Sequence, residues 1–358
     1  MHDFEEARQL VIRAVADRVC PAASVEVGHA GGPRWREAFG SLTYEAGAEP
    51  TRPGTVFDLA SLSKVIATTT IAARLVGTGR LSLDALVGDV IAEWTGAERV
   101  TVTVRDLLEH CAGLPAHAPL FDTCRTPAAA RSAIAAWPLE YAPRTRSVYS
   151  DLGFILLGWI LEASTGLSLH ALWADVKTAC GALEGDAPFA FNPPAAWRPR
   201  IAPTRHDDWR GRLLVGEVDD NNAWALGGVA GHAGLFGTAG AVGGVARVWL
   251  QALRAPIEAR AGAAVPRDVL EEFLRPSAVP GSSRACGWDL MRPASSCGTR
   301  MSARAFGHTG FTGTSLWLDP DRDLYVVLLT NRVHPTAGGS EGIQILRRSF
   351  HDAVVGTG

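Results

Sequence analysis

Ser61 and Lys64 are the first residues whose types and spacing suggest chemistry, in the stretch FDLASLSKVIATTTIAARLV of residues 57–76. Lys64 stands out because it is one of only two lysines among 34 basic side chains. If a helix begins near Ser61, side chains three residues apart lie on one face, so the amine can reach the hydroxyl. A lysine partly removed from water can take the proton of a serine, whereas an arginine stays protonated. The pair therefore indicates nucleophilic attack by Ser61.

The start of that helix adds a second feature. Its free backbone N–H groups and the positive end of its dipole lie near Ser61, and they suit the oxyanion that forms on an attacked carbonyl. An S-x-x-K pattern also occurs in many helices in which the serine only caps the helix and the lysine is solvated. The catalytic interpretation therefore depends on further motifs.

Two later segments supply such motifs. SVYSDLGFILLGWILE places Tyr149-Ser150-Asp151 directly before an amphipathic helix. AFGHTGFTGTSLWLDP places His308-Thr309-Gly310 at the start of a predicted strand. A tyrosine of the core is the alternative interpretation of Tyr149.

In this order, the motifs resemble those of the serine β-lactamase and penicillin-binding-protein superfamily, in particular the branch with class C β-lactamases, D-Ala-D-Ala carboxypeptidases and family VIII esterases. That superfamily carries S-x-x-K at the start of a helix, Tyr-x-Asn on a loop of a helical lobe and Lys/His-Thr-Gly on an edge strand. Here the motifs read S-L-S-K, Y-S-D and H-T-G, and they extend from residue 57 to about residue 331. The resemblance implies the fold of that superfamily and an acyl-enzyme on the serine.

The resemblance also implies a role for each matched residue. Ser61 is expected to be the nucleophile, Lys64 to hold or take its proton, and Tyr149 to relay protons as general base and then general acid. The backbone N–H groups of Ser61 and Phe311 are expected to form the oxyanion hole. The other motif residues are expected to contact the substrate in the cleft, namely Asp151, His308, Thr309 and Gly310.

Two of these residues depart from the superfamily pattern. Asp151 stands where β-lactamases usually have Asn, and it adds negative charge. His308 replaces the lysine of class C β-lactamases, and an unperturbed imidazole is fully charged only below a pH of about 6.5. Both changes are expected to weaken recognition of an anionic β-lactam, while acyl transfer itself stays possible.

The segment NAWALGGVAGHAGLFGTAG, residues 222–240, also resembles a stretch of many bacterial serine hydrolases of this superfamily. Its glycines are expected to shape a loop that borders the cleft. His232 within it is expected to have a structural or hydrogen-bonding role, since the motifs already supply a base.

Composition limits the expected partners, the expected location and the expected state of the cysteines. Apolar residues make up 47 % and charged residues 20 %, as in soluble globular proteins, and the net charge of −3 argues against nucleic acid as a partner. No apolar run reaches the roughly 18–20 residues of a membrane span, and the start MHDFEEARQL is acidic where a secretory signal is basic, so a cytoplasmic location is expected. The six cysteines form no C-x-x-C pair and are expected to be mostly free, buried thiols; they are Cys20, Cys111, Cys124, Cys180, Cys286 and Cys297.

The pattern of elements predicts the architecture. Apolar spacing predicts a helix over residues 4–19, and alternation around Gly31-Gly32-Pro33 predicts a hairpin. A helix over 61–76 and mostly helical segments over 81–274 follow, then strands in TSLWLD and DLYVVLLTN and a closing helix over about 341–354. The two ends are expected to pair into one antiparallel sheet flanked by helices, an α/β (α+β) fold. Residues 1–80 and 275–358 would form the sheet lobe and residues 81–274 a mostly helical lobe, with the site in the cleft between them.

We therefore expect a serine hydrolase that acts on ester or amide carbonyls, with an ester as the first choice because its leaving group needs less protonation than an amine. A β-lactamase or a D-Ala-D-Ala carboxypeptidase is the alternative, and a catalytically silent penicillin-binding or acyl-sensing protein is the alternative from another class. The expected partner is a small-molecule ester, β-lactam or peptide. No metal or organic cofactor is expected, since the sequence contains no phosphate loop or dinucleotide fingerprint.

Overall fold

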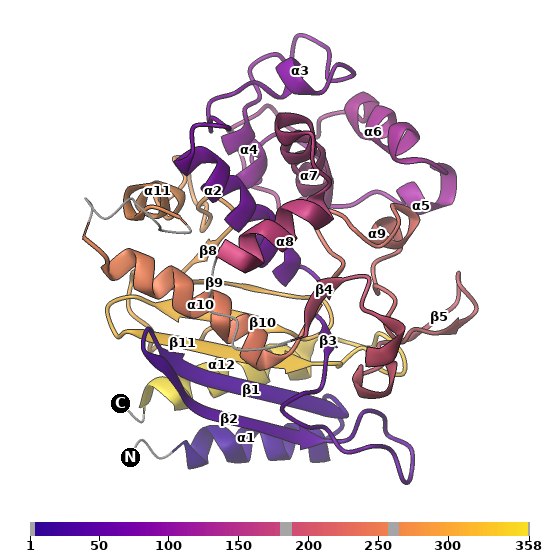
Figure 1. The fold of residues 1–358 in the computed structure, drawn as a ribbon, viewed down its shortest axis with the longest axis vertical. Coiled ribbons are helices and arrows are strands. Elements are labelled where there is room, and N and C mark those ends of the chain that lie inside the picture. The colour runs from indigo at the N-terminus through magenta and orange to yellow at the C-terminus, as the bar shows by residue number, and fades with distance from the viewer. Residues whose placement is uncertain (1–3, 180–187, 257–264, 357–358) are drawn as a thin grey trace.

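The computed structural model describes residues 4–179, 188–256 and 265–356. A six-stranded antiparallel sheet forms the lower half of the view in Figure 1 together with the helices that cover it. In spatial order its strands are β2 (Gly32–Gly40), β1 (Ala22–His29), β11 (Leu324–Thr330), β10 (Ser315–Asp319), β9 (Phe306–Thr309) and β8 (Asp289–Leu290). The two ends of the chain lie side by side in this sheet, because Ala23 of β1 is opposite Thr330 of β11. This pairing confirms the predicted α+β fold.

Helices cover both faces of the sheet, as the side chains of β11 require. Val326 and Leu328 pack with α1 (Glu5–Ala16) and α12 (Glu341–Gly356) on one face. Tyr325, Val327 and Leu329 point to the other face, where α10 (Ala239–Arg254) lies across β1 and β11. Successive residues of a strand point to opposite faces, and β11 is buried on both sides, which explains why it is almost entirely apolar.

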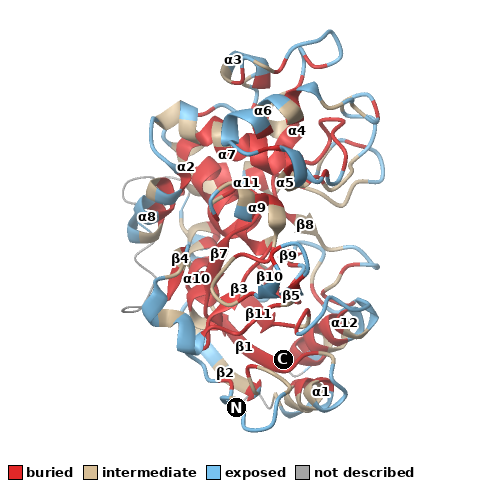
Figure 2. Ribbon diagram, turned by 90° about the vertical axis from the view of Figure 1, so that its right-hand side faces the viewer, coloured by how far each residue is buried: buried red, intermediate tan, exposed pale blue. Residues whose placement is uncertain are grey.

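The rest of the chain forms a mostly helical part beside the sheet, with buried α7 at its centre (Figure 2). Its helices are α3 (Val87–Val90), α4 (Val104–Leu108), α5 (Leu120–Thr123), α6 (Pro127–Ala136), α7 (Asp151–Thr165), α8 (Leu169–Ala179), α9 (Asn221–Ala225), α11 (Arg267–Phe273) and the 3₁₀ helix η2 (Ala195–Arg200). Short strands form two further small sheets, one of β3 (Phe57–Asp58), β7 (Leu235–Gly237) and β4 (Phe189–Phe191), the other of β5 (His206–Asp207) and β6 (Arg212–Leu213).

The motif segments take up mostly the predicted elements. Lys64 opens a π-helical turn, η1 (Lys64–Thr69), which continues as α2 (Thr70–Gly77), in agreement with the predicted helix. Such turns are rare and are often found at functional sites. The prediction for H-T-G is wrong in one detail, because His308 and Thr309 end strand β9 and do not start a strand. The chain turns there, since the Gly313 N–H donates a hydrogen bond to the Gly310 carbonyl.

The division into a sheet lobe of residues 1–80 and 275–358 and a helical lobe of residues 81–274 stays a prediction. Helix α10 belongs to the second range by sequence, and it packs on the sheet. The sheet and its covering helices therefore draw on the middle of the chain as well as on its ends.

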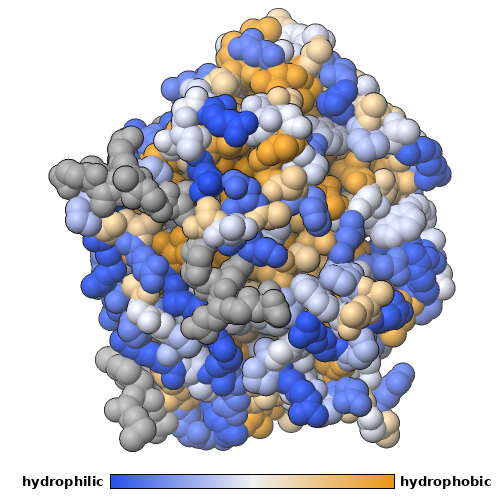
Figure 3. Space-filling view, in the orientation of Figure 1, coloured by the Kyte–Doolittle hydropathy of each residue, from blue (hydrophilic) through white to orange (hydrophobic). Residues whose placement is uncertain are grey.

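Three further observations concern the predicted location and the cysteines. Within the described ranges, no single helix is both long and apolar enough to cross a membrane; α7 and α8 meet that test only together, and they are bent by 78°. Hydrophilic side chains cover most of the lower part of the face seen in Figure 3, and hydrophobic ones show mainly above it.

Cys20, Cys111, Cys124, Cys286 and Cys297 are free and buried, as predicted, and Cys180 lies outside the described residues.

A buried charged cluster fixes α10 to the sheet. Glu26 of β1 is fully buried, and its carboxylate lies 2.5 Å from Arg36 Nε and 3.1 Å from Arg247 Nη1 of α10. The Tyr325 hydroxyl donates a further hydrogen bond to it at 2.7 Å. Gly243 of α10 makes room for this cluster, because a Cβ at that position would lie 2.0 Å from Glu26 Oε1. The cluster thus joins α10, β1, β2 and β11.

Replacing Glu26 by alanine should lower the free energy of unfolding by about 3–5 kcal/mol, because it leaves the buried Arg247 guanidinium without its anion. Glu37→Ala is the matched control, since that carboxylate is 29 % exposed and pairs with Arg8 near the surface. The control should cost less than about 1 kcal/mol. Urea denaturation of both variants measures the difference, and equal losses would show that the cluster does not hold α10.

Candidate active site

Ser61 and Lys64 meet as their spacing predicts. Lys64 Nζ donates hydrogen bonds to Ser61 Oγ at 3.0 Å and to the backbone oxygen of His232 at 3.0 Å. It also forms an ion pair with Asp151 Oδ1 at 2.8 Å, and the lysine side chain is completely buried. These three acceptors use all three N–H bonds of an ammonium group. A neutral amine has only two N–H bonds, so it would direct its lone pair toward one of these three oxygen atoms.

The charge of Lys64 follows from the same contacts. Burial alone would lower the pKa of Lys64, but the Asp151 carboxylate, with a smaller contribution from Tyr149, raises it above its ordinary value. The expectation that burial makes Lys64 a ready proton acceptor is therefore wrong for the resting site. Lys64 instead holds a positive charge beside the Ser61 hydroxyl.

Asp151 is fixed as a carboxylate by this pair. Burial alone would raise the pKa of Asp151, but the Lys64 charge, followed by His117 and His232, holds it well below its usual range. The second oxygen of Asp151 lies 3.8 Å from Nδ1 of half-exposed His117, and this contact raises the pKa of His117. The predicted contact of Asp151 with substrate stays a prediction, since one of its oxygens is already paired with Lys64.

Tyr149 closes the triangle of groups around Ser61. Its ring centre lies 4.8 Å from Lys64 Nζ and 5.3 Å from Cζ of Arg284. Its hydroxyl is buried and makes no hydrogen bond of ordinary geometry with the described residues. Burial raises the pKa of the Tyr149 phenol, and the nearby Lys64 ammonium opposes this rise without cancelling it. The resting site thus holds a neutral phenol beside a charged lysine.

A strained turn presents Ser61. Ala60, directly before it, has a φ of 47° in the left-handed region, a conformation that costs an L residue roughly 1–2 kcal/mol. The carboxylate of Asp58 accepts a hydrogen bond from the Ala60 N–H at 2.8 Å. Gly310 packs on the same turn, where a Cβ would lie 2.7 Å from the Leu59 carbonyl oxygen. The glycine of H-T-G is therefore required by this close approach.

The predicted oxyanion hole has open donors. Neither the Ser61 N–H nor the Phe311 N–H donates a hydrogen bond to any residue of the described chain. Phe311 follows Gly310, which touches the turn before Ser61. Two free N–H groups on neighbouring segments suit a developing oxyanion. The oxyanion role of both groups stays a prediction.

His308 is buried and neutral. Its Nδ1 lies 2.8 Å from the Thr309 carbonyl oxygen, which can only accept, so the ring proton lies on Nδ1. Its Nε2 therefore carries a lone pair, and it has no partner among the described residues. Burial, followed by the charges of Arg284 and Lys64, lowers the pKa of His308 well below its usual range. His308 adds no positive charge to the site at neutral pH.

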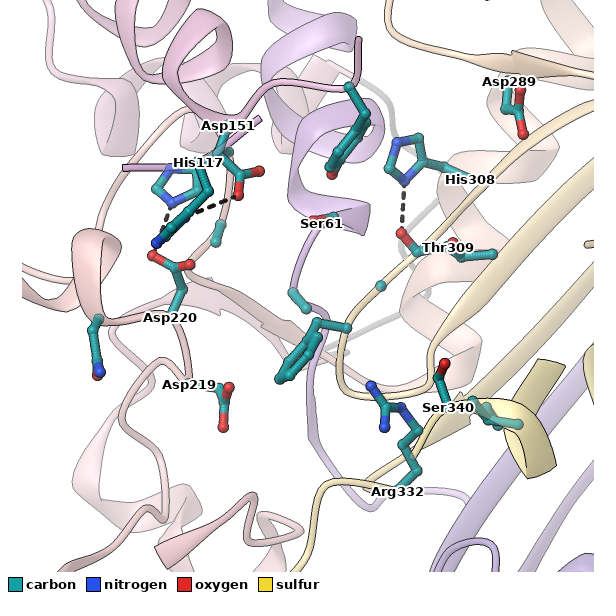
Figure 4. A pocket seen from close by; sticks show the side chains of 18 of the residues that line it. Ser61, His117, Asp151, Asp219, Asp220, Asp289, His308, Thr309, Arg332 and Ser340 are labelled. Carbon is teal, nitrogen blue, oxygen red and sulfur yellow. Dashed lines mark hydrogen bonds and ion pairs between the residues drawn. The ribbon is translucent and has the colours of Figure 1, made fainter. Parts of the chain in front are cut away.

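The candidate residues line a cavity of about 690 Å³. In Figure 4, Asp151 and His117 lie on one side of Ser61, and His308 lies on the other. Two arginines of the lining, Arg284 and Arg332, form no ion pair with a carboxylate of the described chain. All eight predicted site residues lie at or beside this cavity; Ser61, Tyr149, Asp151, His308, Thr309, Gly310 and Phe311 line it, and Lys64 lies beneath Ser61.

His232 lines the cavity and also holds Lys64 in place. Its Nε2 lies 2.9 Å from Asp220 Oδ1, and its backbone oxygen holds Lys64. The loop reaches this position because Gly231 is pressed against α7, where a Cβ would lie 2.0 Å from the Phe154 carbonyl oxygen. These contacts agree with the structural role expected for His232 and for the glycines around it.

Sequence reasoning missed Asp58, His110, His117 and Arg284. A readable signal existed for Asp58, because an acid three residues before the serine lies inside the quoted motif segment. The His110 ring lies beside that of Tyr149, with ring centres 4.7 Å apart, but nothing in the surrounding sequence marks His110 as a site residue. The same holds for His117 and Arg284, which reach the cavity only through the tertiary fold.

Comparisons with known proteins agree with the fold described above. A family model described as Beta-lactamase matches residues 7–348. The chain is 28 % identical over 338 residues to a protein of Escherichia coli O157:H7 named putative D-alanyl-D-alanine carboxypeptidase, covering 84 % of this chain and 76 % of that protein. Among solved structures, EstCE1, a hydrolase with promiscuous acyltransferase activity, matches with a TM-score of 0.77 at 19 % identity, covering 98 % of both chains. A class C β-lactamase from Rhodobacter sphaeroides matches with a TM-score of 0.73 at 21 % identity, covering 98 % of this chain and 99 % of that one.

Asp151→Asn should lower the pKa of Lys64, because the carboxylate is what raises it. The chain contains only two lysines, Lys64 and Lys177, so lysine labelled with ¹³C at Cε gives two side-chain NMR signals. A pH titration of both proteins follows each signal, and the Lys177 signal is the internal control. An unchanged Lys64 midpoint in the variant would contradict the assigned ion pair.

Proposed function

The chain belongs to the β-lactamase family, and from this premise we propose that it hydrolyses carboxylic esters through an acyl-enzyme on Ser61. The observation that carries the proposal is the contact of Ser61 Oγ with the buried Lys64 ammonium at 3.0 Å, next to the Tyr149 phenol, in an open cavity. A serine becomes a nucleophile when a neighbouring base takes its proton. A chance S-x-x-K helix would not need a buried ion pair and a tyrosine around one hydroxyl.

The proposed reaction has two halves. In the first, the Ser61 oxygen attacks the ester carbonyl while its proton passes to the phenolate form of Tyr149, which the Lys64 charge stabilises. The N–H groups of Ser61 and Phe311 bind the oxyanion, and the C–O bond to the alcohol breaks as Tyr149 returns the proton to the alcohol oxygen. In the second half, water gives its proton to Tyr149 and attacks the acyl-enzyme carbonyl. The bond from that carbon to Ser61 Oγ then breaks as Tyr149 passes the proton to the serine oxygen, which frees the acid and Ser61.

An ester fits the site better than a β-lactam. Class C β-lactamases carry a lysine at the position of His308, whereas burial keeps the His308 imidazole neutral here. An alcohol is also a better leaving group than an amine, so it needs less help from an acid. EstCE1, which has a similar fold, is described as a hydrolase with promiscuous acyltransferase activity, and acyl transfer is the chemistry proposed here.

A second candidate is a D-Ala-D-Ala carboxypeptidase. Arg284 and Arg332 line the cavity without a carboxylate partner in the described chain, and a free guanidinium suits the terminal carboxylate of a peptide. The relative from Escherichia coli carries that activity in its name, with the word putative. A catalytically silent penicillin-binding or acyl-sensing protein is the candidate from another class.

One experiment separates these candidates. Purified protein is incubated in parallel with para-nitrophenyl esters, nitrocefin and D-Ala-D-Ala peptides, and intact mass is recorded alongside product. Steady release of para-nitrophenol alone supports the esterase. Turnover of nitrocefin or of the peptide supports the corresponding alternative, and a lasting adduct on Ser61 without turnover supports the silent binder.

Ser61→Ala should abolish ester turnover and adduct formation while the unfolding midpoint stays close to that of the wild type, because the hydroxyl is the nucleophile and only one oxygen is removed. The measurements are para-nitrophenol release, intact mass after a fluorophosphonate probe and a thermal melt. Ser63→Ala is not a suitable control, since the Ser63 hydroxyl binds the Leu235 N–H in the core. Ser349→Ala serves instead, because that hydroxyl bonds only within exposed turns of α12. A Ser61→Ala protein that still forms the adduct would contradict the proposal.

The value of kcat/KM should rise with pH through the neutral range. The pKa values of both Lys64 and Tyr149 are raised, so the proton-accepting form of the pair is the minor form at pH 7. The logarithm of kcat/KM should then increase by about one unit per pH unit, until the pH reaches the lower of the pKa values of Lys64 and Tyr149. Initial rates between pH 6 and 10, corrected for spontaneous hydrolysis, test this. A plateau that begins below pH 7 would contradict the assignment.

A further inference from the structure

Asp58 is a buried carboxylate outside the three motifs, only 2 % exposed, that lies three residues before Ser61. Its Oδ1 accepts the hydrogen bond from the Ala60 N–H at 2.8 Å, and its Oδ2 accepts one from the Asp219 N–H at 2.6 Å. Its backbone oxygen accepts a third from the Thr312 hydroxyl at 2.8 Å. Every oxygen of Asp58 therefore accepts a hydrogen bond.

These three donors belong to three different parts of the site. Ala60 is the strained residue of the turn that presents Ser61. Asp219 directly precedes Asp220, which binds His232, whose carbonyl oxygen holds Lys64. Thr312 directly follows Phe311, whose N–H is the second donor of the proposed oxyanion hole. Asp58 thus joins the segments that carry the nucleophile, the support of the lysine and the oxyanion donor.

We propose that Asp58 is a positioning residue for acyl transfer, and that its carboxylate form holds the turn before Ser61 in the reactive geometry; this inference rests on the proposed function. A carboxylate can accept both N–H bonds at once. A carboxylic acid places an O–H opposite one of the two N–H groups and loses that bond. Protonation of Asp58 therefore loosens either the turn before Ser61 or the segment of Asp219.

The charges around Asp58 place this protonation in the neutral range. Burial, followed by the Asp219 carboxylate, raises the pKa of Asp58 from 3.8 to about 7, and Asp220 adds to the rise. Asp219 is itself paired with Arg205 at 3.3 Å. Two further partners of Asp58 among the described residues are uncharged: Phe236 pairs with it in the small sheet, and the Thr312 hydroxyl donates to its backbone oxygen.

Ionisation of Asp58 should lower the stability of the protein and raise its activity. Because the folded-state pKa of Asp58 is raised, the stability it contributes is present below its unfolded value near 3.8 and is lost as the pH rises through about 7. Activity should instead gain from ionisation, since the carboxylate holds both N–H groups. The wild-type profile of kcat/KM should therefore be steeper below about pH 7 than above it.

The test is Asp58→Asn, which keeps the shape but cannot accept both N–H bonds, because its amide nitrogen is a donor. We expect kcat with a para-nitrophenyl ester to fall about 10–100-fold, as a small misplacement of a reacting group would cause. KM should change by less than about twofold. The kcat/KM profile of the variant should no longer be steeper below pH 7 than above it. The unfolding midpoint at pH 8 should hardly change, because the substitution removes a buried charge along with the hydrogen bond.

Asp319→Asn is the matched control. Asp319 is also fully buried and accepts hydrogen bonds from the Ser302 N–H at 2.7 Å and from the Ser302 hydroxyl at 2.6 Å, but it lies at the end of β10 away from H-T-G. This variant should lose stability and keep the wild-type kcat and pH profile. A purely structural role of Asp58 would make both variants behave alike.

A second variant tests the turn directly. Asp58→Asn combined with Ala60→Gly should recover part of the lost kcat, because glycine adopts the left-handed conformation without strain. Failure of this recovery would overturn the claim that Asp58 acts through Ala60. Wild-type kcat and an unchanged pH profile in Asp58→Asn alone would overturn the whole inference. If the wild type itself neither hydrolyses esters nor reacts with a fluorophosphonate at Ser61, the proposed function fails instead.

Discussion

The buried ion pair of Lys64 and Asp151 is the interaction on which the site depends. Removing two charges from water costs several kcal/mol for each ion, and only close contact and further hydrogen bonds repay it. Here the ammonium is completely buried, and its remaining two N–H bonds go to Ser61 and His232. Each of these partners is therefore held by the need to satisfy the charge. The result is a positive centre whose position beside the nucleophile is fixed before substrate arrives.

The fixed charge of Lys64 gives Lys64 and Tyr149 different roles in the proposed reaction. A lysine that is held as an ammonium cannot take the serine proton, but it lowers the cost of a phenolate on the neighbouring Tyr149. An asparagine in place of Asp151 would leave the amine freer to lose its proton. The Asp in the Y-S-D motif therefore favours Tyr149 over Lys64 as the base in the proposed reaction.

Much of the fold and site could be predicted because the signals are local. The spacing of Ser61 and Lys64 gives their contact within one helix, and alternation gives the strands that pair the two chain ends. The charge of Lys64 could not be predicted, because Asp151 comes to it from the start of a different helix. The neutrality of His308 depends on burial and on the charges of Arg284 and Lys64, which the fold brings close to it. Electrostatics of this kind belong to the packed structure and not to the motif.

The site is also tied to the packing of the whole chain through close backbone contacts. Gly310 touches the turn before Ser61, and Gly231 touches α7, and neither position has space for a Cβ. The segments that these glycines bring together lie far apart in the sequence: the His232 carbonyl that holds Lys64 is 168 residues away, and the Thr312 hydroxyl on Asp58 is 254 residues away. These contacts are therefore all long-range in sequence. The three short motifs therefore gain their chemistry from long-range packing, since an S-x-x-K helix alone would leave its lysine in water and its serine as an ordinary cap.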